Sequence, residues 1–251
     1  MDLGQILLLL AAGLAGGAFN AAAGGGSLIT FPALLAVGLS PLAANVTSAV
    51  AMCGGNLGIV GGYRRELHGQ RPRIERLLPV ALLGAAAGVV ALELSSEDAF
   101  DSIVPFLILG ACGLLAAQPS LKRRLAERGP ATRRHAIALY AGVAVIGGYA
   151  AYFGAASGVM MLALLGTLVT DSLQRLNALN RFLVFAANGL AAFAFAFIAP
   201  VDWEAALILL PATVVGGTGG SLLARRLSDT VLRAVVIAFG LAAAVYLLAT
   251  S

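Results

Sequence analysis

The stretch from Asn20 to Ser27 could bind an anion, because it places polar side chains next to Gly24, Gly25 and Gly26. Asparagine and serine side chains can donate hydrogen bonds, and glycine-rich turns can leave backbone N–H groups open to a ligand. Each glycine costs roughly 1 kcal/mol relative to alanine inside a helix, so a helix is expected to break here. In a lipid-facing segment, a break needs surrounding protein or a water-filled cavity. The stretch is therefore either a very close helix contact or the floor of a permeation site, and the sequence leaves both interpretations open.

A second glycine-containing stretch, from Gly154 to Gly158, has a similar character. Backbone N–H groups at the start of a helix lie at the positive end of the helix dipole, which attracts anions. Gly154, Ser157 and Gly158 could form such a site in the second half of the chain. The alternative is close packing of small residues between helices. That alternative is favoured for four other glycines: Gly84, Gly88, Gly216 and Gly220.

Asparagines deep inside apolar segments are further candidates, because a buried amide must find hydrogen-bond partners. Asn188 is twelve residues from Pro200, or about 18 Å along a helix, which is close to the middle of a bilayer. Asn56 lies at the same depth in the first half. Each could hold two helices together or line a site, and the shared depth favours the site. Polar residues nearer the segment starts could cap helices or line the mouth of a site: Asn45, Thr47, Ser48, Asn177 and Asn180.

Arg181 is the most informative charge in the chain. It lies six residues after Arg175 and ten after Asp171, in a segment that becomes apolar at once. A cation inside a membrane segment is a functional hypothesis by default, and a guanidinium can bind an oxyanion through two N–H groups. The alternative is that the Arg181 side chain extends its head group to the nearby cytoplasmic face. Arg175 is expected at that interface, paired with Asp171.

Composition places all of these residues in a membrane protein. The chain has 251 residues, of which 60% are hydrophobic and 11% are charged, and its mean hydropathy is +0.94. Soluble domains carry about 25% charged residues, and a soluble fold of this length could not solvate so much apolar surface. The charged residues cluster at the ends of apolar runs, so the net charge of +4 needs no nucleic-acid partner. The expected partners are the lipid bilayer and a small anion.

Ten apolar runs could cross a bilayer as helices, which takes about 20 residues. The second and the seventh are short and broken by glycine, so they could be half-length or re-entrant. We therefore predict an all-α, polytopic transmembrane helical bundle with some broken segments. The ten runs are Leu3–Phe19, Ala21–Val37, Pro41–Gly62, Leu77–Leu94, Phe100–Ala117, Ala136–Phe153, Gly154–Val169, Leu173–Ile198, Trp203–Ala224 and Val231–Ala249.

The segments between these runs indicate the orientation of the chain. Residues 63–76, residues 118–135 and the pair Arg225–Arg226 are basic, whereas residues 93–101 and 199–204 are acidic. Cytoplasmic loops carry an excess of Lys and Arg, so the basic segments are expected in the cytoplasm and the acidic ones outside. Both chain termini then lie outside. These features predict a multi-pass protein of the cell (inner) membrane.

The chain also resembles itself when it is shifted by 132 residues without a gap. Asparagine and proline are rare here, so their coincidence is informative. The pairs are Asn45 with Asn177, Asn56 with Asn188, Pro79 with Pro211, Gly16 with Gly148, Gly26 with Gly158, Gly84 with Gly216 and Gly88 with Gly220.

The same shift pairs loops of opposite charge. The basic residues 63–76 align with the non-basic residues 195–208, so equivalent loops face opposite sides of the membrane. We therefore predict two inverted-topology repeats of about five segments each, an architecture typical of secondary transporters. The predicted divisions of this single membrane domain are a first repeat (1–119), a basic cytoplasmic linker (120–135) and a second repeat (136–251).

The chain resembles the sulfite exporter TauE/SafE family of membrane permeases over nearly its whole length. The residues that carry the resemblance are Gly24–Ser27, Phe31-Pro32, Asn45-Val-Thr-Ser48 and a weaker second copy at Gly154–Gly158 and Asn177–Asn180. In that second copy Ala156 and Ser157 replace two glycines, and Leu164 stands where Pro32 would be. The resemblance implies transport of small sulfur-containing anions, such as sulfite, sulfonates or sulfoacetate.

Missing residue types narrow the function further. No Asp, Glu or His lies in the middle of an apolar run, which argues against a metal-cation exporter and against a proton relay built from side chains. The two histidines, His68 and His135, lie in linkers, away from any nucleophile, and no Walker-type loop is present. We expect no metal, no cofactor and no enzymatic activity.

We therefore predict a secondary transporter that moves a small anion by alternating access. A non-transporting scaffold or assembly subunit is the alternative, and a membrane-embedded enzyme is the least favoured. The sequence leaves open the substrate, the direction, the coupling ion and whether the chain forms a homo-oligomer. The candidate substrate-binding residues are Asn20, Gly24, Gly25, Gly26, Ser27, Asn45, Thr47, Ser48, Asn56, Ser157, Gly158, Asn177, Asn180, Arg181 and Asn188.

Overall fold

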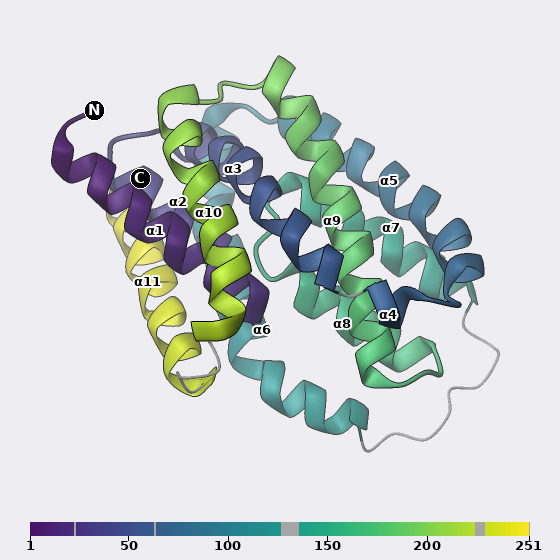
Figure 1. The fold of residues 1–251 in the computed structure, drawn as a ribbon. Helices are drawn as coiled ribbons and strands as arrows, with labels where there is room; N and C mark the ends of the chain where they lie inside the picture. The colour runs from purple at the N-terminus through teal and green to yellow at the C-terminus, as the bar shows by residue number, and fades with distance from the viewer. Residues whose placement is uncertain (23, 63, 127–135, 224–228, 251) are drawn as a thin grey trace.

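The structure is a computed structural model that describes residues 1–22, 24–62, 64–126, 136–223 and 229–250. These residues form helices and no strand (Figure 1), which confirms the expected all-α class. The helices are α1 (Leu3–Ala22), α2 (Ser27–Ala36), α3 (Pro41–Gly62), α4 (Arg64–Leu67), α5 (Arg71–Glu93), α6 (Glu97–Ala126), α7 (Ala136–Tyr152), α8 (Ser157–Leu168), α9 (Leu173–Ile198), α10 (Trp203–Leu223) and α11 (Asp229–Thr250).

The helices suit a bilayer by their length and their surface. Within the described residues, four helices, α1, α5, α6 and α9, are long and apolar enough to cross a membrane. Large apolar side chains point outward from the bundle, and Leu83 and Phe197, for example, are 73% and 76% exposed. Contact of such side chains with lipid chains is favourable, whereas their exposure to water is unfavourable. All the expected apolar runs form helices, and α4 is an additional short helix in the first basic segment.

The expected half-length segments are α2 and α8. They contain 10 and 12 residues, which corresponds to about 15 and 18 Å of helix. A hydrocarbon core is roughly 30 Å thick, so each reaches only about half-way across. Each therefore begins or ends inside the bundle, where its terminal backbone groups need protein or a cavity around them.

The breaks before α2 and α8 contain left-handed backbone. The angle φ is +73° at Gly24, +118° at Gly25 and +80° at Gly154. Glycine adopts these angles without the steric cost that a Cβ atom brings. Ala156 also has a positive φ, 59°, which costs a residue with a side chain roughly 1–2 kcal/mol. The glycines explain why the chain turns at these two places.

Helix starts in the two halves keep one spacing, except at the breaks. α3 and α9 begin 132 residues apart, as do α5 and α10, and α6 and α11. In contrast, α2 and α8 begin at Ser27 and Ser157, 130 residues apart, and α8 is two residues longer. The gapless shift is therefore wrong at the breaks, where it paired Gly26 with Gly158. The pairing of Gly16 with Gly148 is wrong by the same two residues, because α1 and α7 end 130 residues apart.

The corrected spacing makes the two breaks more alike. Gly24 now corresponds to Gly154, and Ser27 corresponds to Ser157. Alanines replace only the second and third glycines of the first break. By the same spacing, Leu162 and not Leu164 stands in α8 where Pro32 stands in α2.

Small residues let the outer helices pack closely, α1 against α10 and α5 against α7. A methyl group added at Gly84 would collide with the backbone carbonyl of Ala144, and one at Gly216 would collide with that of Leu14. Gly88 lies in the same way against Gly148. The packing interpretation is thus confirmed for Gly84, Gly88 and Gly216, whereas the surroundings of Gly220 lie outside the described residues.

Helices α3 and α9 run through the middle of the bundle and contact each other. Figure 1 shows them between one group, α1, α2, α10 and α11, and another, α5, α7 and α8. α3 also packs on α10, and α9 packs on α5. The two broken segments therefore meet beside a central helix pair.

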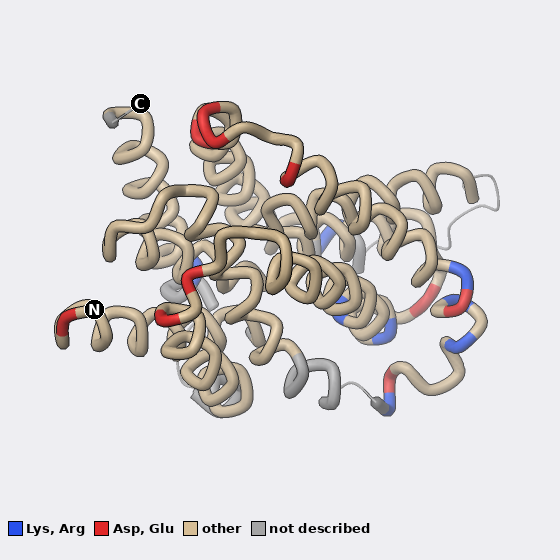
Figure 2. The backbone as a smooth tube through the Cα atoms, turned by 90° about the horizontal axis from the view of Figure 1, so that it is seen from above, with Lys and Arg blue, Asp and Glu red and all other residues tan. Residues whose placement is uncertain are grey.

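Charged side chains are separated along the bundle. Figure 2 shows Lys and Arg gathered mostly at the end away from the chain termini, with several Asp and Glu residues at the end near the N-terminus. The N- and C-termini lie at the same end (Figure 1). At the basic end Arg175 pairs with Asp171 as expected, at 3.1 Å between Nε and Oδ1, and Arg73 of α5 also pairs with Asp171. Much of the expected basic linker (127–135) and the pair Arg225–Arg226 fall outside the described residues.

Candidate functional site

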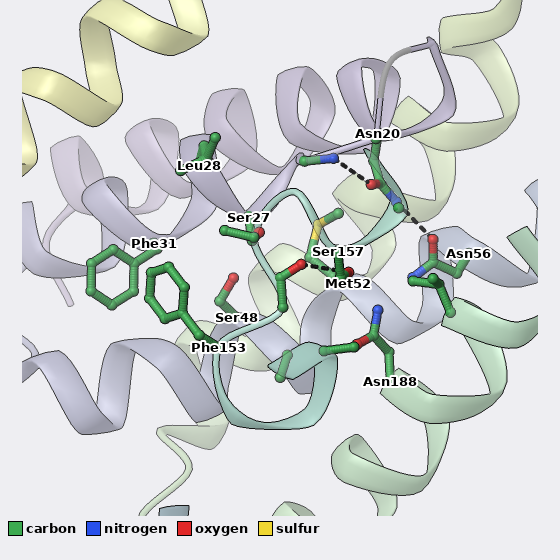
Figure 3. A pocket seen from close by; sticks show the side chains of 18 of the residues that line it. Asn20, Ser27, Leu28, Phe31, Ser48, Met52, Asn56, Phe153, Ser157 and Asn188 are labelled. Atoms are coloured by element: carbon green, nitrogen blue, oxygen red, sulfur yellow. Dashed lines mark hydrogen bonds between the residues drawn. The ribbon is translucent and has the colours of Figure 1, made fainter. Parts of the chain in front are cut away.

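A cavity lies where the two breaks meet α3 and α9 (Figure 3). Its volume is about 70 Å³. A cavity volume of roughly 10–15 Å³ on the same measure is enough to hold one buried water molecule. The cavity can thus hold a small ion. Most of the candidate residues line it: Asn20, Gly24, Gly25, Ser27, Asn45, Ser48, Asn56, Ser157, Gly158, Asn180, Arg181 and Asn188.

The N-termini of α2 and α8 converge at this cavity. A methyl group added at Gly25 would lie 4.0 Å from the backbone nitrogen of Ala156, so the two breaks almost touch. Among the described residues, no acceptor is found for the backbone N–H of Ser27 or of Gly158. Each short helix thus directs an open N–H group and the positive end of its dipole toward the same space.

Asn20 organises the first break through its main chain and its side chain. Its carbonyl oxygen accepts a hydrogen bond from the N–H of Gly24 at 3.1 Å. Its side-chain Oδ1 accepts from the N–H of Gly25 at 3.1 Å and of Gly26 at 3.5 Å, and its Nδ2 donates to Oδ1 of Asn56 at 2.7 Å (Figure 3). Asn20 therefore replaces the helical partners that the break removes and links α1 to α3.

Arg181 reaches the first break from α9. Its Nη1 donates to the carbonyl oxygen of Asn20 at 2.8 Å, and its guanidinium lies beside Gly24. The head group thus points toward the first break and the cavity. The carbonyl belongs to the last turn of α1, where a cation is stabilised by the helix dipole. Arg181 is placed both to cap α1 and to meet an anion in the cavity.

Helix α3 contributes polar groups whose hydrogen bonds are made within the protein. Asn45 donates from Nδ2 to the carbonyl oxygen of Tyr152 at 2.9 Å, which ties α3 to the end of α7. The hydroxyl groups of Ser48 and Thr30 are 2.6 Å apart. These bonds fix the wall of the cavity in the first half of the chain.

Helix α9 contributes amides that are less fully bonded. Asn180 is buried, and its Nδ2 donates to Oδ1 of Asn177 at 3.5 Å, but no described atom donates to its own Oδ1. No hydrogen bond to Asn188 is found among the described residues, and its Oδ1 lies near Gly154. The hydroxyl of Ser157 donates to the Gly154 carbonyl at 2.8 Å (Figure 3).

Three candidate residues do not line the cavity. Gly26 is packed so closely that a methyl group there would collide with the Gly16 carbonyl and with Met52. The Thr47 hydroxyl accepts a hydrogen bond from the N–H of Asp202 at 3.0 Å, so it fastens α3 to the α9–α10 turn. Asn177 stands one turn before Asn180 and holds its amide.

Comparison with known proteins identifies the family. A family model described as "Sulfite exporter TauE/SafE" matches residues 9–247. The chain belongs to this family. TauE/SafE proteins are membrane transporters, so membership also confirms that the chain is not an enzyme.

Three relatives of this TauE/SafE protein are probable membrane transporter proteins. One from Haemophilus influenzae is 28% identical over 244 residues, which are 94% of this chain and 92% of the relative. ORF9 of Sinorhizobium sp. is 26% identical over 97% of this chain and 92% of its own length. YfcA of Escherichia coli K12 is 26% identical over 88% of this chain and 81% of its own length. No solved structure matches the chain significantly.

The TauE/SafE cavity also has an apolar wall, whose side chains are not among the predicted substrate-binding residues. Phe31 and Phe153 meet edge to face with their ring centroids 5.8 Å apart, and Met52 and Phe185 also line the space. Phe153 directly precedes Gly154, so its position next to a break was a usable signal. Apolar residues are so common in this chain that a single phenylalanine does not stand out in the sequence, whereas polar residues and glycines at the breaks do.

Among the described residues, the cavity lining contains no Asp, Glu or His. No cluster of possible metal ligands is found in the described part of the chain either. The polar groups are amides, hydroxyls, backbone N–H groups and one guanidinium. This set can bind an anion through hydrogen bonds and has no carboxylate to repel it.

Proposed function

We propose that this protein is a secondary transporter that carries a small sulfur-containing anion, such as sulfite or a sulfonate, across the cell (inner) membrane by alternating access. The observation that carries the proposal is the convergence of two helix N-termini and Arg181 on one cavity between α3 and α9. The family membership supports a transporter, and the cavity supports an anion as its cargo.

The chemistry of the cavity favours negative charge over positive charge. Helix N-termini bind anions through open N–H groups and through the helix dipole. A guanidinium adds N–H donors in a planar array that matches the oxygen atoms of a sulfonate or sulfite group. Discontinuous helices whose N-termini point at an anionic group are a recurring device in secondary transporters.

The contacts between helices support an inverted repeat. The counterparts of α1, α3 and α5 in the second half are α7, α9 and α10. Under this exchange the α1–α10 contact corresponds to an α7–α5 contact, and the α3–α10 contact corresponds to an α9–α5 contact. Both of these contacts are present. The loop charges favour opposite insertion of the halves, with basic loops in the cytoplasm and both termini outside. Rocking of one repeat against the other would open the cavity to each side in turn.

The test is transport by the full-length protein in proteoliposomes. Uptake of labelled sulfite and of labelled sulfonates is measured in wild type, in Arg181→Ala, and in Arg76→Ala. Arg76 is an exposed cation on α5 that does not line the cavity, so it controls for loss of positive charge.

We expect anion uptake by wild type and by Arg76→Ala, and loss of most uptake in Arg181→Ala. Wild-type vesicles that remain tight to every anion, with the protein folded, would overturn the proposal. That result would leave the scaffold alternative.

A further inference from the structure

One buried side-chain oxygen in the cavity lining has no hydrogen-bond donor among the described residues. Asn180 is only 2% exposed, and no described atom donates to its side-chain Oδ1. Burying an amide oxygen in this state is costly, so each case in a native protein needs an explanation. Asn180 lines the cavity, so a bound molecule can reach this oxygen.

The hydrogen bond to Asn177 orients the Asn180 amide. Its Nδ2 donates to Oδ1 of Asn177 at 3.5 Å, and Oδ1 of Asn180 occupies the other corner of the amide. A methyl group added at Gly158 would lie 3.9 Å from that oxygen. Gly158 is the second residue of α8, so the acceptor stands beside the helix N-terminus that we propose to bind the anion.

The first half of the chain satisfies the equivalent position internally. Ser48 and Asn180 are each the eighth residue of their helix, α3 and α9. Ser48 bonds to the hydroxyl of Thr30, the fourth residue of α2, at 2.6 Å. The fourth residue of α8 is Met160, which has no donor to offer. At this pair of equivalent positions, α9 thus presents an unfilled acceptor and α3 does not.

We propose that Asn180 Oδ1 accepts a hydrogen bond from the transported anion, which therefore carries an O–H or N–H group next to its charged head. The inference rests on the transport function proposed above and narrows its substrate class. Sulfonates with a hydroxyl or amino group near the sulfur meet this requirement, as does hydrogen sulfite. The anionic oxygens face the N–H groups of Ser27 and Gly158 and the guanidinium of Arg181, and the donor faces Asn180.

An anion without a donor leaves the Asn180 oxygen unpaired in the complex, so the site should discriminate against it. The penalty for one unpaired buried acceptor corresponds to roughly tenfold to hundredfold in kcat/KM. The discrimination should depend on Asn180, because its oxygen is fully buried without a donor among the described residues, whereas the oxygens of Asn20 and Asn56 already have donors in the protein.

The experiment compares anions that differ by one donor, using the full-length protein in proteoliposomes. Methanesulfonate is compared with hydroxymethanesulfonate, and ethanesulfonate with 2-hydroxyethanesulfonate. Sulfite at mildly acidic pH, which includes the donor-bearing hydrogen sulfite ion, is compared with methanesulfonate, which has no O–H or N–H group. This comparison tests an inorganic anion beside the organic ones. Each comparison is made in wild type, in Asn180→Leu and in Ser48→Ala.

We expect wild type to prefer the donor-bearing member of each sulfonate pair by roughly tenfold to hundredfold. Asn180→Leu should bring the ratio close to one, mainly by losing the preferred anion. Ser48→Ala should leave the ratio unchanged even where both rates fall. The same ordering should appear without transport, as a larger rise of the melting temperature of wild-type protein with the donor-bearing anion.

Equal rates for the two members in wild type overturn the inference, as does a preference that persists in Asn180→Leu. In both results anions still cross, so the transporter proposal stands. If no anion crosses and none raises the melting temperature, the transporter proposal itself fails. If Asn180→Leu does not fold, the wild-type ratios and melting shifts decide.

Discussion

The guanidinium of Arg181 in α9 donates a 2.8 Å hydrogen bond to the main-chain carbonyl of Asn20, in the last turn of α1. The two residues are 161 positions apart in the chain and belong to opposite halves. Their contact joins the central helix pair to the first break at the edge of the cavity.

Arg181→Lys should keep the positive charge and lose the planar set of N–H donors. A hydrogen bond to a charged group contributes roughly 1.5–3 kcal/mol, and an ammonium can replace only part of the guanidinium contacts. We expect folded protein with a lower melting temperature and an anion kcat/KM reduced by about tenfold. Parallel thermal melts and proteoliposome fluxes measure both. Unchanged flux would show that Arg181 is a structural cap only.

Gly25→Ala should disturb the first break through backbone conformation and not through lack of space. The nearest atom to a methyl group there would be 3.8 Å away, but φ is +118°, which side-chain-bearing residues rarely adopt. We expect a loss of roughly 1–2 kcal/mol in stability. Gly110→Ala is the control, because a methyl group in α6 at that position meets nothing within 4 Å. If both variants melt alike, the left-handed turn does not constrain the break.

Gly84→Val should separate α5 from α7. A side chain at Gly84 collides with the backbone of Ala144, and overpacking in a well-packed contact costs typically about 1–3 kcal/mol. Gly113→Val in α6 is the matched control, since its position is open. Thermal unfolding in detergent compares the two. A Gly84 variant as stable as its control would mean that the helices can move apart without cost.

The Asp171 ion pairs should make stability depend on pH at the acidic end of the scale. Partial burial acts to raise the pKa of Asp171, but hydrogen bonds from Arg73, Arg175 and the Ser172 amide outweigh it and lower the pKa below its ordinary value. The carboxylate is thus favoured in the folded state. Its stabilisation is complete above the ordinary aspartate pKa, about 3.9, and is lost as pH falls through the lowered folded-state pKa.

Asp171→Asn should therefore melt below wild type at neutral pH, and the difference should shrink as the pH falls below about 4. Glu75→Gln is the control, because the Arg71–Glu75 pair is exposed and such pairs contribute little. Melting temperatures across the pH range provide the measurement. A difference that does not change with pH would show that Asp171 acts through shape or packing and not through its charge.

The candidate site was largely predictable because polar residues are rare in this sequence. An asparagine or arginine in an apolar segment has to be buried with partners or exposed to a cavity, so Asn20, Asn56, Arg181 and Asn188 were informative from their surroundings alone. The glycines likewise predicted the first break. The inverted orientation of the halves and the substrate class remain predictions.

Other features depend on contacts that no local pattern contains. Thr47 looked equivalent to its neighbours, yet its hydroxyl holds the α9–α10 turn and not the cavity. The aromatic pair Phe31–Phe153 forms only when the two breaks meet. The two-residue difference between α2 and α8 left a gapless comparison out of register at the breaks. The first two features are decided by how the helices pack and not by the local sequence.

One guanidinium contacts the Asn20 carbonyl and faces the cavity, so the same side chain takes part in both the framework and the proposed anion site. An anion that attracts the Arg181 guanidinium would, when it binds, weaken the hydrogen bond between α9 and the last turn of α1. Anion binding and loosening of this contact would then be coupled, so the loaded protein would change conformation more readily than the empty one.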